Sequence, residues 1–436
     1  MNKGKTMMKF IATSDWHIGN LFHGNDRLPE HKHFLQWLLA LLTAERPDAL
    51  LVAGDIFDNG NPSAAAQSAY YEFLADATRA CPGMQIIITA GNHDSANRLE
   101  APRALLSRHS VEVRGVVHRS WRPDEEGGGR WEVDFDDLMI PIRAREGDGE
   151  AVVLAVPYLR NDVLQSDSYS QGVNTFLREL TAKARAKYPG KALVMMAHMY
   201  ARGADIAQLE ASEKIVIGGL EAVDMEGWAD HPDYMTCGHI HKRQHLWNTS
   251  WARYTGSVLP MSVAEADYTH GVDVITIEGS EAGGRSIRTN LREYVPQHRL
   301  LVLPNDDEGL SPKKLKTLIE KELPDRRDGQ LDDSFVYLFL KVKLDKAGND
   351  DLTELHSAIG RKNAVLCRMQ KVMPGINLST MADSQQIRSI DDILSRNPLD
   401  TLKEAFELKH NEAMSEHQEA MLQTLLNTFD EENKDA

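Results

Sequence analysis

Three short apolar runs, separated by helical patterns, constrain the fold of this chain more than any other feature of its sequence. The runs are KFIATS at 9–14, ALLVAG at 49–54 and QIIITA at 85–90. Between them, residues 30–47 carry apolar side chains at helical spacing, and residues 64–80 are rich in Ala and Tyr. Strands that alternate with helices predict an α/β fold with a layered sheet that is at least partly parallel.

Later runs continue this pattern to about residue 285. They are AVVLAV at 151–156, ALVMMA at 192–197, YMTC at 234–237 and VDVITI at 272–277, and a helix is expected over 174–188. We therefore expect a first domain over residues 1–285. Residues 117–150 look like an insertion, in which the Gly-rich EEGGGR between Trp121 and Trp131 indicates a hairpin tip or a flexible loop.

A second pattern follows the first domain. Strand-like and helical segments alternate over about 80 residues, which predicts a small α+β domain at 290–375. The tail at 388–436 favours helices that either pack on their own domain or dock on a partner protein. Its broken apolar stripe consists of Leu402, Phe406, Met414, Met421, Leu425 and Phe429.

Charge and composition limit the class of protein. The formal net charge of −16 opposes nucleic-acid binding, although bound metal cations or a partner would add positive charge. Residues 401–436 alone hold nine acidic and three basic residues. No run approaches the ~20 apolar residues of a membrane span, and the N-terminus lacks the apolar core of a signal peptide. Cys81, Cys237 and Cys367 lie far apart without paired spacing, which fits a reducing cytoplasm.

Metal-competent side chains follow the strands at their C-terminal ends, where open α/β sheets bind ligands. Each short motif is weak by itself, and the signal lies in their combination and order. Residues two apart in an extended segment point to one side, so Asp15 and His17 can share a centre. The candidate ligands are Asp15, His17, Asp55, Asn92, His198, His239 and His241.

This set of oxygen and imidazole donors suits Mn²⁺, Fe or Zn²⁺ better than Ca²⁺ or Mg²⁺. Asp55 can bridge two cations with its two carboxylate oxygens, and cations ~3.5–4 Å apart can hold a phosphate oxygen and activate a water. His93 is placed to protonate the leaving alkoxide, and the Asp58 carboxylate to orient the His93 imidazole. Alternatively, His93 is a structural neighbour of the ligands and Asp58 caps the next turn.

Five motifs, taken in order, resemble those of the calcineurin-like metallophosphoesterase superfamily. They are Asp15-x-His17, Gly54-Asp55-x-x-Asp58, Gly91-Asn92-His93-Asp94, His198 and Gly238-His239-x-His241. The pattern is specific for the fold and a dinuclear site, and much less specific for substrate. Longer stretches, such as TSDWHIG at 13–19 and GSVLPMS at 256–262, are similar to the bacterial SbcD nuclease subunits over most of the chain.

The resemblance implies a layered β-sandwich flanked by helices, with the small domain as a cap that contacts DNA. It implies two divalent ions, Mn²⁺ above all, with His93 as the acid. The first ion would be held by Asp15, His17, Asp55 and His241, and the second by Asp55, Asn92, His198 and His239.

The resemblance also implies 3′→5′ exonuclease action on duplex DNA ends and endonuclease action on single strands or hairpins, in DNA repair and recombination. The implied partners are DNA, an SMC-like ATPase (SbcC) docked on the C-terminal helices, and a second copy of the chain bound through helices near 64–108. Alternatively, the helices near 64–108 simply cover the sheet. Three features depart from the family pattern: Ala197 stands where Gly usually precedes the histidine, the 117–150 insertion is long, and residues 1–7 precede the usual start.

Two other functions share the metal ligands. A stand-alone phosphoesterase for a small nucleotide or phosphoprotein would have little use for the cap and the terminal helices. An inactive scaffold would be expected to lack ligands, whereas all seven are present. Basic residues near the motifs either contact DNA phosphates or are solvated loop charges. They are Arg98, Arg103, Arg202, Lys242 and Arg243.

Overall fold

The computed structural model describes residues 7–123, 128–164, 166–205, 222–279, 284–306, 308–343 and 349–372. The chain divides into one unit that ends at Val372 and a second unit, Met373–Ala436. The helical tail predicted at 388–436 therefore lies outside the described residues, and every element below belongs to the first unit. In the described part of the chain, no helix is long and apolar enough to span a bilayer.

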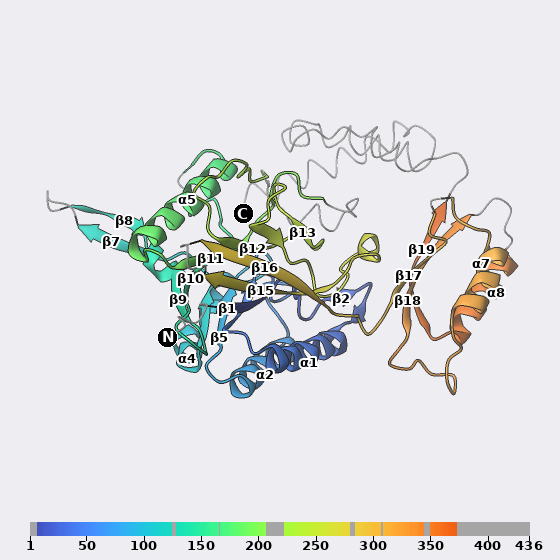
Figure 1. Ribbon diagram of the computed structural model, residues 1–436. Helices are drawn as coiled ribbons and strands as arrows, with labels where there is room; N and C mark the ends of the chain where they lie inside the picture. The colour runs from blue at the N-terminus through green and yellow to red at the C-terminus, as the bar shows by residue number, and fades with distance from the viewer. Residues whose placement is uncertain are drawn as a thin grey trace, which may run out of the picture. The chain divides into compact units, whose positions relative to one another are not determined.

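Two six-stranded sheets form the body of the first unit (Figure 1). The first contains, in order, β16 (Arg285–Glu293), β15 (Gly271–Gly279), β1 (Met7–Thr13), β4 (Ala49–Ala53), β5 (Gln85–Thr89) and β6 (Val111–Arg114). The second contains β13 (Gln244–His245), β14 (Ala252–Tyr254), β12 (Tyr234–Gly238), β11 (Ala192–His198), β10 (Glu150–Ala155) and β9 (Met139–Arg143). Strands β1, β4, β5 and β6 are parallel, and so are β10, β11, β12 and β14, as the alternation of strands and helices predicts.

Alternation along each strand packs the two sheets face to face. In β4, Leu51 faces the second sheet, where it joins a cluster with Val153 and Val194. Its neighbours Leu50 and Val52 face the opposite way, into a cluster with the helices. Because both faces are apolar, these strands read as continuous hydrophobic runs rather than as alternating ones.

Helices cover the outer face of each sheet (Figure 1). α1 (Leu28–Glu45) and α2 (Ala64–Ala80) pack on the first sheet, and α5 (Tyr169–Lys187) packs on the second. α2 begins after Ser63, whose hydroxyl accepts a hydrogen bond from the Ala66 N–H at 3.2 Å. α1 ends at the left-handed Arg46, just before Pro47. The helices expected at 30–47, 64–80 and 174–188 are therefore present.

The first sheet continues beyond residue 285, where we expected the first domain to end. β16 pairs with β15 over its whole length and extends the sheet to Glu293. The sequence of β16, RSIRTNLRE, lacks an apolar run because it is an edge strand whose side chains are exposed or half-buried. The boundary expected at 285 therefore falls before the last strand of this sheet.

The segment 117–150 has two parts. β7 (Arg119–Pro123) and β8 (Gly129–Val133) pair as an antiparallel hairpin, as one of the two readings of EEGGGR predicted, and its tip, 124–127, lies outside the described residues. Trp121 and Trp131 stand opposite each other, with ring centroids 5.7 Å apart. The second part is not an insertion, because β9 pairs with β10 as the edge of the second sheet.

The described residues between 299 and 372 form a small domain, which we call the cap. It comprises β17 (Leu300–Leu303), α7 (Pro312–Glu322), β18 (Val336–Lys343), α8 (Asn349–Arg361) and β19 (Ala364–Val372), and its three strands are parallel. Leu338 and Leu340 face the helices. Tyr337 and Phe339 face the other way and pack on Phe22, in the short hairpin of β2 (Leu21–Phe22) and β3 (Asn25–Asp26).

Candidate metal centre

All seven predicted ligands lie at the C-terminal ends of strands, at the same edge of the two sheets. Asp15 and Asp55 follow β1 and β4, and Asn92 follows β5. His198 ends β11, and His239 follows β12. Because β1, β4 and β5 are parallel, and β11 and β12 are parallel, each sheet delivers its loops to one edge.

Two groups of donor atoms come together at this edge. Donor atoms of Asp15, His17 and His241 all lie within 4.8 Å of one another, and so do donor atoms of Asp15, Asp55 and His198. Asn92 joins the second group.

The amide oxygen of Asn92 marks a convergence point. Asn92 Oδ1 lies 3.0 Å from His198 Nε2 and 3.0 Å from His239 Nδ1. Ligands bound about 2.1 Å from one ion in neighbouring positions lie about 3 Å apart. This spacing fits a divalent ion among the three side chains.

Asp55 lies between the two groups. We expected both of its carboxylate oxygens to face the metal site, but only Oδ2 approaches ring nitrogens of both groups. Its Oδ2 is 3.8 Å from His17 Nε2 and 3.3 Å from His198 Nε2. Its Oδ1 instead accepts a hydrogen bond from the His93 main-chain N–H at 2.9 Å. The second oxygen therefore fixes the loop after β5.

The histidine His17 tests whether the site fits metal ions. It is 1% exposed, and neither of its ring nitrogens has a hydrogen-bond partner among the described residues. Buried polar atoms in native proteins are nearly always paired, so two such nitrogens call for a ligand. Burial, above all, holds the pKa of His17 well below its usual range, which keeps the imidazole in the neutral form that binds metals. A divalent ion bound by nitrogen and oxygen donors meets these requirements.

The charges of the second group are strongly coupled. Burial would raise the pKa of Asp55, but the imidazoles of His198 and His17 beside it hold that pKa well below its usual range. Burial would likewise lower the pKa of His198, but the Asp55 carboxylate outweighs it and raises the pKa to about 9. Burial and the neighbouring His198 lower the pKa of His239 to about 3.

Four of the seven predicted ligands have left-handed backbone conformations. The φ angles are 52° at Asp15, 47° at His17, 50° at Asp55 and 99° at His239. The Asp15 N–H donates to the Gly54 oxygen at 3.1 Å, and the His17 N–H to the Asp55 oxygen at 3.0 Å, so the loops after β1 and β4 hold each other in place. Such conformations cost about 1–3 kcal/mol each and cluster at functional sites.

Motif glycines make room for these side chains. A Cβ atom on Gly54, where φ is +85°, would lie 2.2 Å from His198 Nδ1. A Cβ on Gly91 would lie 2.1 Å from Asp55 Oδ1. Both motifs therefore need glycine at this position for a steric reason.

Two histidines are oriented by acceptors behind them. His198 Nδ1 donates to the Ala53 main-chain oxygen at 3.0 Å, which leaves its Nε2 to face Asp55 and Asn92. His241 Nδ1 lies 3.0 Å from Glu265 Oε1, which directs the other nitrogen of His241 away from this carboxylate. Glu265 is 1% exposed and also accepts from the Met261 N–H at 2.9 Å. Partners of this kind set the orientation and basicity of metal-binding histidines.

Sequence reasoning missed Glu265 and the role of Asp94. Glu265 lies in the short helix η3 (Val263–Glu265), and no spacing pattern connects it with a histidine 24 residues away. The Asp94 carboxylate accepts from the N–H groups of Gly91, Ile56 and Phe57 at 2.9–3.1 Å and so joins the loops after β4 and β5. The order Gly-Asn-His-Asp was the available signal for Asp94.

His93 lies beside the first group of ligands. Its ring stands edge-on to that of His17, with centroids 4.8 Å apart. Its Nδ1 lies 2.8 Å from the main-chain oxygen of Asp58. The Asp58 carboxylate, which we expected to orient His93, instead accepts from Asn20 Nδ2 at 2.8 Å and lies 3.7 Å from His17 Nδ1. The orienting contact thus comes from the backbone, which needs no particular side chain at position 58.

Comparison with known proteins assigns this fold and site to a protein family. The family model described as calcineurin-like phosphoesterase matches residues 8–243. The chain therefore belongs to the calcineurin-like phosphoesterase family, and the protein is a metal-dependent phosphoesterase.

Within this family, the chain is similar to a narrower group of curated proteins. The chain is 37% identical to the SbcD subunit of the SbcCD nuclease from Rhodobacter capsulatus, over 77% of this chain and 80% of the relative. It is 28% identical to proteins of the same name from Escherichia coli K12 and Bacillus subtilis 168, over 63% of this chain and 66% and 67% of the relatives. The resemblance to SbcD nuclease subunits is thereby confirmed.

Proposed function

We propose that this protein is the nuclease subunit of an SbcCD-type complex. In this proposal it hydrolyses DNA phosphodiesters with two divalent ions, Mn²⁺ above all, in the cytoplasm during DNA repair and recombination. It would act as a 3′→5′ exonuclease on duplex ends and as an endonuclease on single strands and hairpins. The observation that carries the proposal is the convergence of six other oxygen and nitrogen donor side chains around Asp55, with His93 beside them.

The residues divide into two sets. One ion would be held by Asp15, His17, Asp55 and His241, and the other by Asp55, Asn92, His198 and His239. When bound, such a pair of ions neutralises charge on the phosphoryl group and readies a water for attack. This chain's own part is to place the donors and to exclude water from Asp15, His17 and Asp55, each at most 2% exposed.

His93 supplies the proton in this mechanism. Because the Asp58 carbonyl can only accept, His93 Nδ1 carries a hydrogen in this contact. A second proton is then held at Nε2, and this is the proton that passes to the leaving alkoxide oxygen. A general acid of this kind contributes about 10²–10⁴-fold to the rate.

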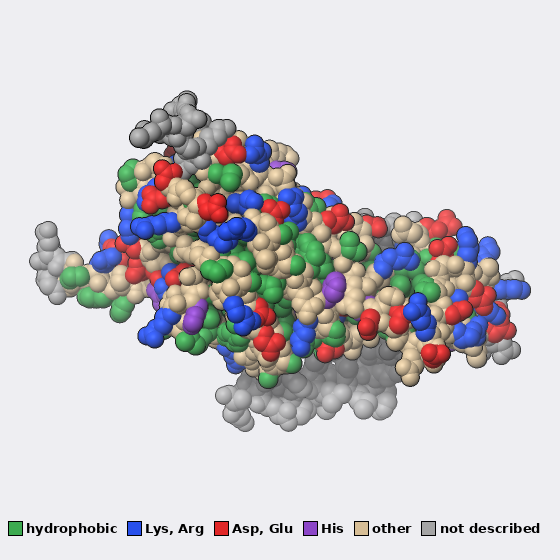
Figure 2. Space-filling view, turned by 60° about the horizontal axis from the view of Figure 1, so that its bottom comes forward, with side chains coloured by type: hydrophobic (Ala, Val, Ile, Leu, Met, Phe, Trp, Pro, Cys, Tyr) green, Lys and Arg blue, Asp and Glu red, His purple; other side chains and the backbone are tan. Residues whose placement is uncertain are grey.

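Basic side chains near the motifs offer little support for direct DNA binding. Arg202 lies 3.2 Å from Asp224, Arg243 lies 2.6 Å from Asp273, and Lys242 and Arg103 pair with Asp205 and Asp137. Figure 2 shows Lys and Arg side chains intermingled with Asp and Glu side chains. We therefore propose that DNA affinity depends on the metal ions and on an SbcC-like ATPase partner.

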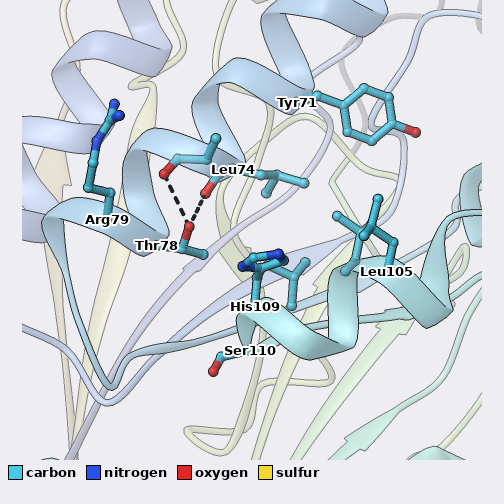
Figure 3. A pocket seen from close by; sticks show the side chains of 10 residues that line it. Tyr71, Leu74, Thr78, Arg79, Leu105, His109 and Ser110 are labelled. Carbon is cyan, nitrogen blue, oxygen red and sulfur yellow. Dashed lines mark hydrogen bonds between the residues drawn. The ribbon is translucent and has the colours of Figure 1, made fainter.

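The proposed homodimer has a candidate surface on α2 and the segment after it. A pocket of about 680 Å³ lies between α2 and the short helices α4 (Arg103–Leu106) and η1 (Ser107–His109) (Figure 3). Tyr71 and Leu105 border it, 37% and 63% exposed. Leu105→Glu should yield monomers by light scattering. Leu21→Glu, also 63% exposed but outside this pocket, should not.

A substrate comparison tests the proposed activity. The purified protein, with and without the ATPase partner and ATP, is given labelled duplex DNA, hairpin DNA and a chromogenic phosphomonoester in Mn²⁺. We expect DNA cleavage that the partner stimulates. Turnover of the monoester without any cleavage of DNA would instead support a stand-alone phosphoesterase.

A further inference from the structure

A buried hydrogen bond joins the cap to the phosphoesterase body. The Tyr337 hydroxyl, on β18 of the cap, donates to Glu30 Oε1 on α1 at 2.8 Å. Both side chains are 1% exposed. Tyr337 also packs on Phe22, with ring centroids 5.2 Å apart, so the cap rests on a polar contact surrounded by aromatic rings.

Glu30 is paired with a fully buried arginine. Arg27 is 0% exposed, and its Nε and Nη2 donate to the two oxygens of Glu30 at 2.9 and 3.1 Å. The guanidinium lies 4.9 Å from the Phe22 ring centroid and 5.8 Å from that of Tyr337. A buried charge left without its partner costs about 3–5 kcal/mol, so Arg27 and Glu30 hold each other firmly.

From Arg27, one branch leads to a metal-site histidine. Arg27 Nη1 donates to the Pro260 main-chain oxygen. The next residue, Met261, donates its N–H to Glu265 Oε2, and Glu265 Oε1 lies 3.0 Å from His241 Nδ1. The same segment carries Val263, which packs against the cluster that Tyr337 forms with Phe22 and Phe339. A shift of Arg27 would therefore move the carboxylate of Glu265, which orients His241.

A second branch leads toward the proposed acid. The main-chain N–H of Arg27 donates to the Asn20 main-chain oxygen at 3.3 Å, and Asn20 Nδ2 donates to Asp58 Oδ1 at 2.8 Å. Asp58 in turn offers its main-chain oxygen to His93. The two branches end on two ring neighbours of His17, whose ring centroid lies 5.2 Å from that of His241 and 4.8 Å from that of His93.

We propose that Arg27, Glu30 and Tyr337 are positioning residues, through which the seating of the cap sets the orientation of His241 and His93. The inference rests on the proposed phosphodiesterase function. According to this inference, the position of the cap changes kcat even for substrates that are too small to contact the cap, because the network links the cap to His241 and His93. Loss of such a network should lower turnover and metal affinity about tenfold, as loss of other outer partners of metal ligands does.

A small diester separates this role from DNA binding by the cap. Hydrolysis of bis(p-nitrophenyl) phosphate in Mn²⁺ is measured for the parent protein, for Tyr337→Phe and for Tyr294→Phe. The control tyrosine is 2% exposed, and its hydroxyl contacts His33 Nδ1 at 2.8 Å, whereas the Tyr337 hydroxyl donates to Glu30. We expect a lower kcat with unchanged KM for Tyr337→Phe only, and weaker Mn²⁺ binding by calorimetry for the same variant.

A double substitution separates positioning from folding. Arg27→Met with Glu30→Leu removes both buried charges at similar volume, an exchange that is often neutral or stabilising. We expect its thermal midpoint to stay near that of the parent while kcat and Mn²⁺ affinity fall about tenfold. Unchanged kcat and affinity in this folded variant would overturn the inference, and so would equal losses in Tyr294→Phe. If the parent hydrolyses no diester, the proposed function fails, and Mn²⁺ affinity alone decides the inference.

Discussion

His93 and Asp58 meet through a side chain and a backbone: Nδ1 of the imidazole lies 2.8 Å from the main-chain oxygen of Asp58. Because a carbonyl oxygen only accepts, this contact fixes which ring nitrogen carries hydrogen in the neutral imidazole. In the proposed mechanism, Nε2 is the ring nitrogen that passes a proton to the leaving oxygen. Any residue at position 58 that keeps the same backbone path offers the same oxygen.

Substitutions at the two positions should therefore differ in effect. His93→Ala should lower kcat about 10²–10⁴-fold with metal occupancy nearly unchanged, because His93 is not among the ligands. Asp58→Ala should lower kcat about tenfold at most, through loss of the Asn20 and His17 contacts of its carboxylate. Steady-state kinetics and metal analysis by mass spectrometry check both. Equal losses at the two positions, or loss of metal in His93→Ala, would contradict this assignment.

A second prediction about the metal site concerns the effect of Glu265 on Mn²⁺ affinity. Glu265→Gln removes the negative charge behind His241 while keeping the shape of the side chain. Affinity for Mn²⁺ should fall about 10–100-fold at the ion that we propose is held by Asp15, His17, Asp55 and His241. Calorimetric titration with Mn²⁺ measures this loss.

The matched control is Asp48→Asn. Asp48 is 7% exposed and accepts from the Lys9 and Arg145 N–H groups at 2.7 Å each, just before β4 and so at the other end of this strand from Asp55. This substitution should lower stability without changing Mn²⁺ affinity. Equal affinity losses in the two variants would mean that Glu265 acts only through the fold.

Local patterns explain what could be predicted from the sequence. Strands buried on both faces are continuous apolar runs, and the ligand motifs directly follow them, so β1, β4 and β5 and the neighbourhood of Asp15, Asp55 and Asn92 were accessible. The edge strand β16 has no such run and was missed. In the cap, apolar runs and helical spacing revealed the order of strands and helices.

Contacts between distant residues explain what could not be predicted. Tyr337 and Glu30 are 307 positions apart, and Arg27 and Pro260 are 233 apart. An arginine three residues before a glutamate that begins a predicted helix looks like half of a surface pair, and nothing local shows that both become buried. The role of the Asp58 backbone was also hidden, because any residue supplies a carbonyl oxygen.

The pH dependence of stability offers a test away from the metal site. Burial, and next the Arg27 guanidinium, lower the pKa of His31 to about 4. In the unfolded chain the pKa is about 6.5, so between these values the unfolded state takes up a proton that the folded state does not. The free energy of unfolding should therefore fall as pH drops from about 6.5 to 4, by about 3 kcal/mol in total from this residue.

Urea unfolding of metal-free protein at pH 7 and pH 5 measures this effect. His31→Gln carries no titrating group, so its stability should depend less on pH than that of the parent, by about 2 kcal/mol over this interval. The comparison cancels the contributions of the other titrating residues. Parallel pH profiles for the parent and the variant would show that His31 does not titrate as its burial requires.

Gly54 and Gly147 separate backbone strain from steric conflict at the metal centre. Their φ angles are +85° and +86°, so alanine at either position meets the same left-handed penalty of about 1–2 kcal/mol. At Gly147 the added Cβ has no heavy atom of the described residues within 4 Å, whereas at Gly54 it would lie 2.2 Å from His198 Nδ1 and 2.7 Å from its Cγ. Gly147→Ala should therefore lose only the backbone term in urea unfolding and bind Mn²⁺ as the parent does. Gly54→Ala must displace the His198 ring, which should add about 1–3 kcal/mol of destabilisation and weaken Mn²⁺ binding. Similar stability and Mn²⁺ affinity in the two variants would mean that His198 moves aside without consequence and is not needed as a ligand.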